Sequence, residues 1–107
     1  VDYRMIGGKS GPSYDDFGQA LTVIATVISQ SHRERATVDA GFKAFATDRK
    51  FGPDLKGVTG VTYRFSGDEH GILDLKNASR EIRLGDRLDF IVPHCDPNVN
   101  LYDRIYR

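Results

Sequence analysis

Residues 21–29 read Leu-Thr-Val-Ile-Ala-Thr-Val-Ile-Ser, and this stretch decides the fold class. Six of the eight residues from Thr22 to Ser29 are β-branched. Such side chains have few χ1 rotamers and pack well on a pleated, half-buried surface. The stretch therefore predicts a long strand, with a buried helix as the weaker alternative.

Shorter segments with strand character follow it, separated by turn signals. Residues 36–40 predict a second strand, and Gly41 indicates a bulge after which residues 42–45 continue that strand. Residues 58–66 alternate large apolar side chains with polar ones, which is the period-two pattern of a strand. Two more strands are expected at residues 72–75 and 88–92, with turns at residues 52–57, 67–68 and 84–87. Short strands at this spacing, without helices between them, predict an all-β barrel or sandwich.

Length and composition set limits on the kind of protein. A chain of 107 residues suits one compact domain. Its 15 basic and 15 acidic residues are interspersed, so it lacks the one-sided basic surface of a nucleic-acid binder. Cys95 is the only cysteine, which excludes an internal disulfide and favours a reducing, cytoplasmic setting. The most apolar stretch, residues 20–28, is too short to span a bilayer, and we expect no membrane partner.

The N-terminal segment contains a Gly-Lys-Ser tripeptide at residues 8–10. The phosphate-binding loop pattern requires a glycine five residues before the Gly-Lys pair, but Tyr3 occupies that position, and Pro12 opposes the helix that must follow. We interpret this segment as a surface loop.

The chain starts at Val1 and stops soon after an amphipathic stretch, so we expect a piece of a larger protein with an exposed apolar face.

One segment has side chains suited to metal binding. The strand at residues 88–92 runs into Pro93-His94-Cys95-Asp96-Pro97. If extended geometry persists past Pro93, His94 and Asp96 share one face while Cys95 points to the other. An imidazole and a carboxylate can together hold a divalent cation such as Mn²⁺ or Zn²⁺. Two protein ligands leave positions open for water, substrate or another domain, as a catalytic metal requires.

The same residues have a purely structural interpretation. Asp96 followed by Pro97 is typical of a helix start, with Asp as the N-cap and Pro at the first helical position. His94 is then a hydrogen-bonded loop residue. On spacing alone this second interpretation is favoured, because such caps are common.

A family resemblance adds to this reading. Residues 93–103, Pro-His-Cys-Asp-Pro-Asn-Val-Asn-Leu-Tyr-Asp, resemble the segment near the C-terminus of D-threonine aldolases and related D-serine dehydratase-like proteins. Residues 20–29, 38–44 and 68–71 resemble further segments in the same order. The resemblance covers nearly the whole chain, and residues 93–103 are its most specific part. It implies that residues 1–107 form the C-terminal β domain of a fold-type III pyridoxal-phosphate enzyme, without its N-terminal barrel. The expected architecture is a small β-barrel like that of alanine racemase, with a short helical turn after Asp96.

The resemblance also assigns residues. In that family the His and the residue two positions later ligate the metal, which here are His94 and Asp96, with Mn, Zn or Mg as the ion. Dehydratase-type relatives often have Cys at the second position, so Asp96 favours the aldolase branch. Cys95 is then a small packing residue.

The cofactor lysine and the catalytic base are not identified in this chain, and the resemblance places them in the N-terminal barrel domain. Lys43 is expected to be a surface or ion-paired residue, with Asp39 as the candidate partner. His70 is expected to face solvent, and a role near the metal stays open.

The implied activity is the cleavage of a D-β-hydroxy-α-amino acid, such as D-threonine, to glycine and an aldehyde. Pyridoxal phosphate withdraws electrons from the breaking Cα–Cβ bond, and the metal lowers the pKa of the β-hydroxyl. The full-length enzyme is expected to be a homodimer, and the chain alone is expected to be inactive. One alternative is a dehydratase of D-serine or 3-hydroxyaspartate on the same scaffold. The other is a non-enzymatic β-barrel binding module with Asp96 as a helix cap.

Overall fold

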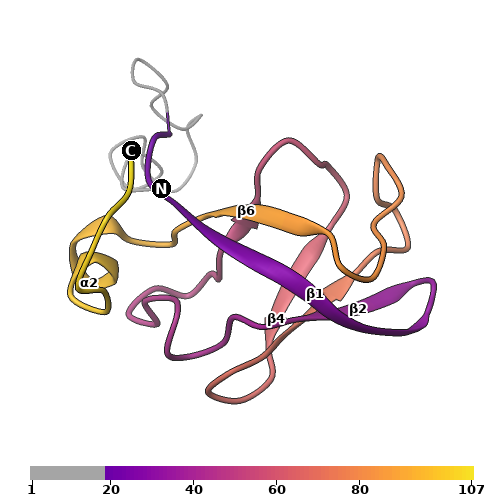
Figure 1. Ribbon diagram of the computed structural model, residues 1–107, viewed down its shortest axis with the longest axis horizontal. Helices are drawn as coiled ribbons and strands as arrows, with labels where there is room; N and C mark the ends of the chain where they lie inside the picture. The colour runs from indigo at the N-terminus through magenta and orange to yellow at the C-terminus, as the bar shows by residue number, and fades with distance from the viewer. Residues whose placement is uncertain (1–18) are drawn as a thin grey trace.

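The structure, a computed structural model, describes residues 19–107, and the Gly-Lys-Ser tripeptide lies outside them. Within this range an antiparallel six-stranded sheet has the order β3-β6-β1-β2-β5-β4. The edge strands β3 and β4 contact each other, so the sheet curls into a nearly closed barrel (Figure 1). The predicted all-β barrel is therefore confirmed. The elements are β1 (Thr22–His32), β2 (Arg35–Val38), β3 (Asp54–Leu55), β4 (Thr62–Phe65), β5 (Gly71–Asp74), β6 (Arg87–Ile91) and the helix α2 (Cys95–Val99).

The long strand β1 connects the two halves of the barrel. Its first part pairs with β6, where Ala25 lies opposite Leu88, and its second part pairs with β2, where Val27 lies opposite Val38. The β1–β2 register shifts after Val27, which marks an irregularity in the ladder. Such irregularities bend a strand and increase its twist. The prediction of a strand at residues 21–29 is confirmed, and β1 extends it to His32.

Aromatic side chains fill the centre of the barrel. The ring of Phe45 meets Tyr63 and Phe90 edge to face, with centroids 5.5 and 5.8 Å away. The Tyr63 hydroxyl donates a 2.6 Å hydrogen bond to the carbonyl of Ala40, and burial raises the pKa of this phenol. A Cβ atom on Gly71 would lie 2.1 Å from the Tyr63 ring, so the packing leaves room only for glycine there.

The predicted continuation of the second strand through residues 42–45 is wrong. The chain turns there, and the amides of Ala44 and Phe45 both donate to the carbonyl of Gly41. A Cβ atom on Gly41 would lie 2.3 Å from the carbonyl oxygen of Gly67, so this glycine permits close contact between two loops. The turn directs Phe45 into the core. A glycine within a strand-like segment indicates either a bulge or a close backbone approach, and here it permits the close approach.

Other predicted boundaries also shift. The connection at residues 52–57, expected to be a turn, contains β3, whose two residues pair with Ile91 and Phe90 of β6. The strand expected at residues 58–66 is limited to β4. The strands expected at residues 72–75 and 88–92 are present as β5 and β6, each starting one residue earlier.

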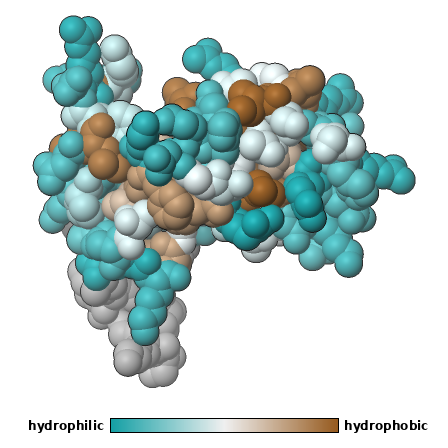
Figure 2. Space-filling view, turned by 90° about the horizontal axis from the view of Figure 1, so that it is seen from below, coloured by the Kyte–Doolittle hydropathy of each residue, from teal (hydrophilic) through white to brown (hydrophobic). Residues whose placement is uncertain are grey.

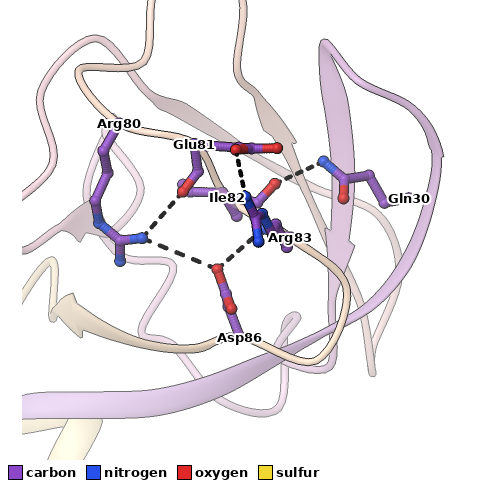
Figure 3. Close-up of polar contacts among 6 residues, drawn as sticks. All are labelled: Gln30, Arg80, Glu81, Ile82, Arg83 and Asp86. Carbon is purple, nitrogen blue, oxygen red and sulfur yellow. Dashed lines mark hydrogen bonds and ion pairs between the residues drawn. The ribbon is translucent and has the colours of Figure 1, made fainter.

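The loop before β6 is fastened against β1. The Gln30 side-chain amide donates a 2.7 Å hydrogen bond to the carbonyl of buried Ile82, and Asp86 accepts a 2.9 Å bond from the Arg83 amide (Figure 3). Arg83 also pairs with Glu81 at 2.9 Å, but both side chains are exposed. Exposed ion pairs contribute little, so the loop depends on Ile82 and the hydrogen bond from Gln30.

The contact between Gly71 and Tyr63 yields a prediction. Gly71→Ala should lower the free energy of unfolding by about 1–3 kcal/mol, the usual cost of overpacking a core. The Tyr63 ring cannot move aside easily, because Phe45 and Phe90 contact it and its hydroxyl is bound. Urea unfolding measures the effect. In a Tyr63→Leu background the same substitution should cost less, and additive costs would contradict the contact.

Candidate metal centre

His94 lies between the end of β6 and the start of α2. Val92 and Pro93 are buried, and His94 follows in an extended conformation with φ −151° and ψ 122°. Figure 1 places α2 at the end of the barrel where β1 begins. His94 is the N-cap residue of α2, and its side chain makes no capping hydrogen bond.

The predicted geometry of Asp96 needs correction in two respects. The helix begins at Cys95, so Asp96 lies in its first turn and is not the N-cap. For the same reason extended geometry does not persist through Asp96, and strand alternation does not decide which way Cys95 points. Asp96 is exposed, whereas Cys95 and His94 are partly buried. A carboxylate in the first turn of a helix is favoured by the partial positive charge at that end.

His94 forms a short contact with a residue that the sequence did not suggest. Its Nδ1 atom lies 2.6 Å from Oδ2 of Asp48, which is 46 residues away in the sequence. The His94 side chain is 18% exposed and that of Asp48 is 42% exposed. The hydrogen bond lowers the pKa of the Asp48 carboxyl below its usual value. Asp48 stands in the run Asp-Arg-Lys, which by sequence alone looks like a solvated charged loop.

Arg49 contacts the other side of the imidazole. Its NH2 atom lies 3.4 Å from Nε2 of His94, and its Nε atom lies 3.7 Å from Oδ2 of Asp48. Three charged or polar groups from two distant segments thus meet at this end of the barrel.

A buried amide fixes the two segments to each other. Asn98 of α2 is 2% exposed, and its Oδ1 accepts a 2.7 Å hydrogen bond from the Ala46 amide. Its Nδ2 donates to the carbonyl of Ala44 at 3.2 Å, and the Tyr102 hydroxyl donates to the same carbonyl at 2.9 Å. Burial raises the pKa of the Tyr102 phenol. Since Asp48 follows Ala46 by two residues, this contact sets the position of Asp48 relative to α2.

Two further predicted site residues lie in other surroundings. Lys43 pairs with Glu69 at 2.6 Å on the surface, which confirms that it is an exposed, ion-paired residue. Asp39 is not its partner, because the Asp39 carboxylate accepts a hydrogen bond from the Thr26 amide at 2.7 Å. His70 is exposed, as expected, in the loop that contacts Gly41.

A groove of about 430 Å³ lies beside α2, between the start of β1 and the segment that follows the helix. Several side chains that line it are both apolar and exposed, among them Ile24, Ile105 and Tyr106. Figure 2 shows apolar patches that interrupt the hydrophilic surface on the face it presents. This agrees with the expected apolar face.

Within residues 19–107, no helix is long and apolar enough to cross a bilayer.

The Asn98 contact yields a second prediction. Asn98→Ala should lower the free energy of unfolding by about 1–3 kcal/mol, because the buried Ala46 amide loses its acceptor. Thermal or urea unfolding measures the loss. The matched control is Asn100→Ala, which removes an exposed amide next to the same helix and should change stability by less than about 0.5 kcal/mol. Equal effects of the two substitutions would contradict the role given to Asn98.

Comparisons with known proteins agree with this architecture. A family model described as a putative serine dehydratase domain matches residues 20–107. The 3-hydroxy-D-aspartate aldolase of Paracoccus denitrificans is 33% identical over 105 residues, which cover 96% of this chain and 26% of that protein. The D-threonine aldolase of an Arthrobacter species is 36% identical over 106 residues, which cover 94% and 27%.

A solved structure gives the same result. The D-threonine aldolase from Filomicrobium marinum superimposes with a TM-score of 0.73 and 33% identity, covering 83% of this chain and 24% of that one. The chain thus spans about a quarter of the length of the relatives it matches. The resemblance seen in the sequence is confirmed, and the chain belongs to the D-serine dehydratase-like family that includes these D-threonine and 3-hydroxy-D-aspartate aldolases.

Proposed function

We propose that this chain is the metal-binding C-terminal domain of a pyridoxal-phosphate-dependent lyase. The activity that we propose for the full-length enzyme is that of a D-threonine aldolase. The reaction is the cleavage of a D-β-hydroxy-α-amino acid to glycine and an aldehyde. Two relatives that match nearly the whole chain are named as aldolases, which supports this class of reaction. The observation that carries the proposal is the His94 imidazole, held by Asp48 at Nδ1 and followed two residues later by the Asp96 carboxylate.

The donor set fits a divalent cation such as Mn²⁺, Zn²⁺ or Mg²⁺. A metal-bound imidazole usually donates its other N–H to a carboxylate, as His94 can to Asp48. Among residues 19–107, three or more His, Cys, Asp or Glu side chains nowhere gather into a metal site. His94 and Asp96 would therefore supply only part of the coordination, and the other positions would be open to water or substrate, as in catalytic sites.

Each group in this chain then has a defined task. His94 and Asp96 would hold the cation, which lowers the pKa of a substrate hydroxyl. Loss of that proton forms the aldehyde carbonyl as the Cα–Cβ bond breaks. Pyridoxal phosphate supplies the electron sink for that bond. Asp48 holds the imidazole, and Asn98 holds the helix that carries Asp96.

We place the cofactor lysine and the proton-accepting base in an N-terminal barrel domain. Lys43 is unsuited to the cofactor role, because it is exposed and paired with Glu69. The apolar groove beside α2, lined in part by Ile24, Ile105 and Tyr106, supports a further domain or a second subunit of a homodimer packing there. We further propose a cytoplasmic setting, consistent with the single cysteine.

A dehydratase on the same scaffold is the second candidate, favoured by the description of the matching family. In that reaction the metal would assist loss of the hydroxyl from D-serine or 3-hydroxyaspartate. The carboxylate at position 96 supports the aldolase instead. A non-enzymatic module with Asp96 as a helix cap has less support, because His94 occupies the cap position.

The proposed site yields a third prediction, for the full-length protein. His94→Ala and Asp96→Ala should each lower metal-dependent cleavage of D-threonine by more than about 100-fold, because direct ligands matter more than the residues behind them. Glycine formation, measured with and without added Mn²⁺, and bound metal per subunit are the readouts. Formation of 2-oxobutanoate from D-threonine would instead indicate the dehydratase.

Two milder variants separate the ligand from its structural alternative. Asp96→Asn keeps the shape and polarity of the side chain, so stability should hold while metal affinity falls with the lost charge. Cys95→Ser is the matched control and should bind metal nearly as the unchanged protein does. Full activity of Asp96→Asn without added metal would exclude the assignment of Asp96. Loss of metal in Cys95→Ser would point to a different ligand set.

A further inference from the structure

The contacts of His94 determine which of its nitrogens carries the proton. A guanidinium group only donates hydrogen bonds, so the contact with Arg49 requires Nε2 of His94 to act as the acceptor. A carboxylate only accepts, so the 2.6 Å contact with Asp48 requires Nδ1 to carry the hydrogen. The Nδ1–H tautomer, whose lone pair is on Nε2, satisfies both contacts.

The backbone holds this arrangement in place. The side chain of Asn98 forms hydrogen bonds with the backbone of Ala44 and Ala46. The backbone amide of Asn98 donates a 3.3 Å hydrogen bond to the carbonyl of His94. The segment that carries Asp48 and the residue that carries the imidazole are thus both hydrogen-bonded to one buried residue, the first through its side chain and the second through its backbone. The pairing of His94 with Asp48 is a consequence of the fold rather than of two mobile surface side chains meeting.

We infer that Asp48 is a positioning residue, which fixes the tautomer and ring orientation of His94 so that Nε2 is presented to the divalent cation. The inference rests on the metal site proposed above and adds to it a residue outside the ligand pair. Asp48 itself does not contact the metal in this assignment. Its negative charge also makes the imidazole a stronger donor, as carboxylates behind metal-bound histidines do.

Arg49 has the opposite expected effect. Its guanidinium lies at the nitrogen that the cation would take, so the two positive groups compete for the same place. Arg49 therefore has to leave Nε2 when the cation binds. Removing its charge should leave metal affinity unchanged or raise it. This makes Arg49 a useful control, because its side chain contacts the same imidazole and carboxylate. If a substitution nearby merely disturbed the local structure, replacing Arg49 would also weaken metal binding.

The test is Mn²⁺ binding by the metal-free full-length protein, measured by titration calorimetry. Asp48→Ala should raise Kd by about 10–100-fold, the usual effect of losing such a partner. Asp48→Asn should have a smaller effect, because its amide oxygen can still accept from Nδ1–H without the charge. Arg49→Gln should not raise Kd. Asp68→Asn, an exposed carboxylate in another loop, should not change Kd.

A spectroscopic readout separates positioning from general stability. Long-range ¹H–¹⁵N correlation spectra of the metal-free protein should show the Nδ1–H tautomer of His94. The signal should be retained in Asp48→Asn and should change toward the Nε2–H tautomer in Asp48→Ala. Asp48→Asn is nearly isosteric at a side chain that is partly exposed, so it should fold normally and keep the test valid.

The possible failures are distinguishable. Unchanged Kd in both Asp48 variants, together with loss of Mn²⁺ binding in His94→Ala, would overturn the positioning role and leave the metal site intact. Unchanged Mn²⁺ binding in His94→Ala would overturn the metal site itself. An equal rise of Kd in Arg49→Gln and Asp48→Ala would show a local disturbance and would also overturn the inference.

Discussion

β1 forms hydrogen bonds with β6 over Thr22–Thr26 and with β2 over Val27–His32, so both halves of the barrel depend on one strand. At the change of partner the Asp39 carboxylate accepts from the Thr26 amide, and the Asp39 amide donates to the Thr26 carbonyl. This anchors the chain just after β2 to the middle of β1. The residues that follow Asp39 then start from a fixed point beside Thr26 and continue toward the residues at the end of β6.

This anchoring explains how distant segments form one site. From Asp39 the chain turns at Gly41 and inserts Phe45 against Phe90, near the end of β6. The loop that carries Asp48 is thereby brought to the residues that follow β6. The amide of Asn98 completes the arrangement, because a buried polar group is retained only when its hydrogen bonds are made. Core packing and one polar contact together bring His94 to Asp48.

The sequence predicted the parts of this structure that depend on local pattern. β-branched residues identified the long strand β1, and alternation in residues 58–66 identified β4, because a half-buried sheet favours stiff side chains and imposes period two. The prediction for residues 42–45 was wrong because it interpreted Gly41 as a bulge, whereas this glycine permits a close contact with the loop at Gly67. The helix start was placed two residues too late because Asp-Pro is a common cap. Asp48 was missed because its partner is 46 residues away and its neighbours are charged.

The proposed division of labour follows from the number of ligands. A structural zinc site is closed by four protein ligands and contributes to folding, whereas a catalytic site leaves positions open. The described part of this chain offers an imidazole and a neighbouring carboxylate, and its barrel is held by an apolar core that needs no metal. A cation bound there would therefore add little to the stability of the barrel and would be available to a substrate. The rigidity that the proposed site requires comes from Asn98 and the packing of Phe45, which hold the backbone around His94 and the loop that carries Asp48.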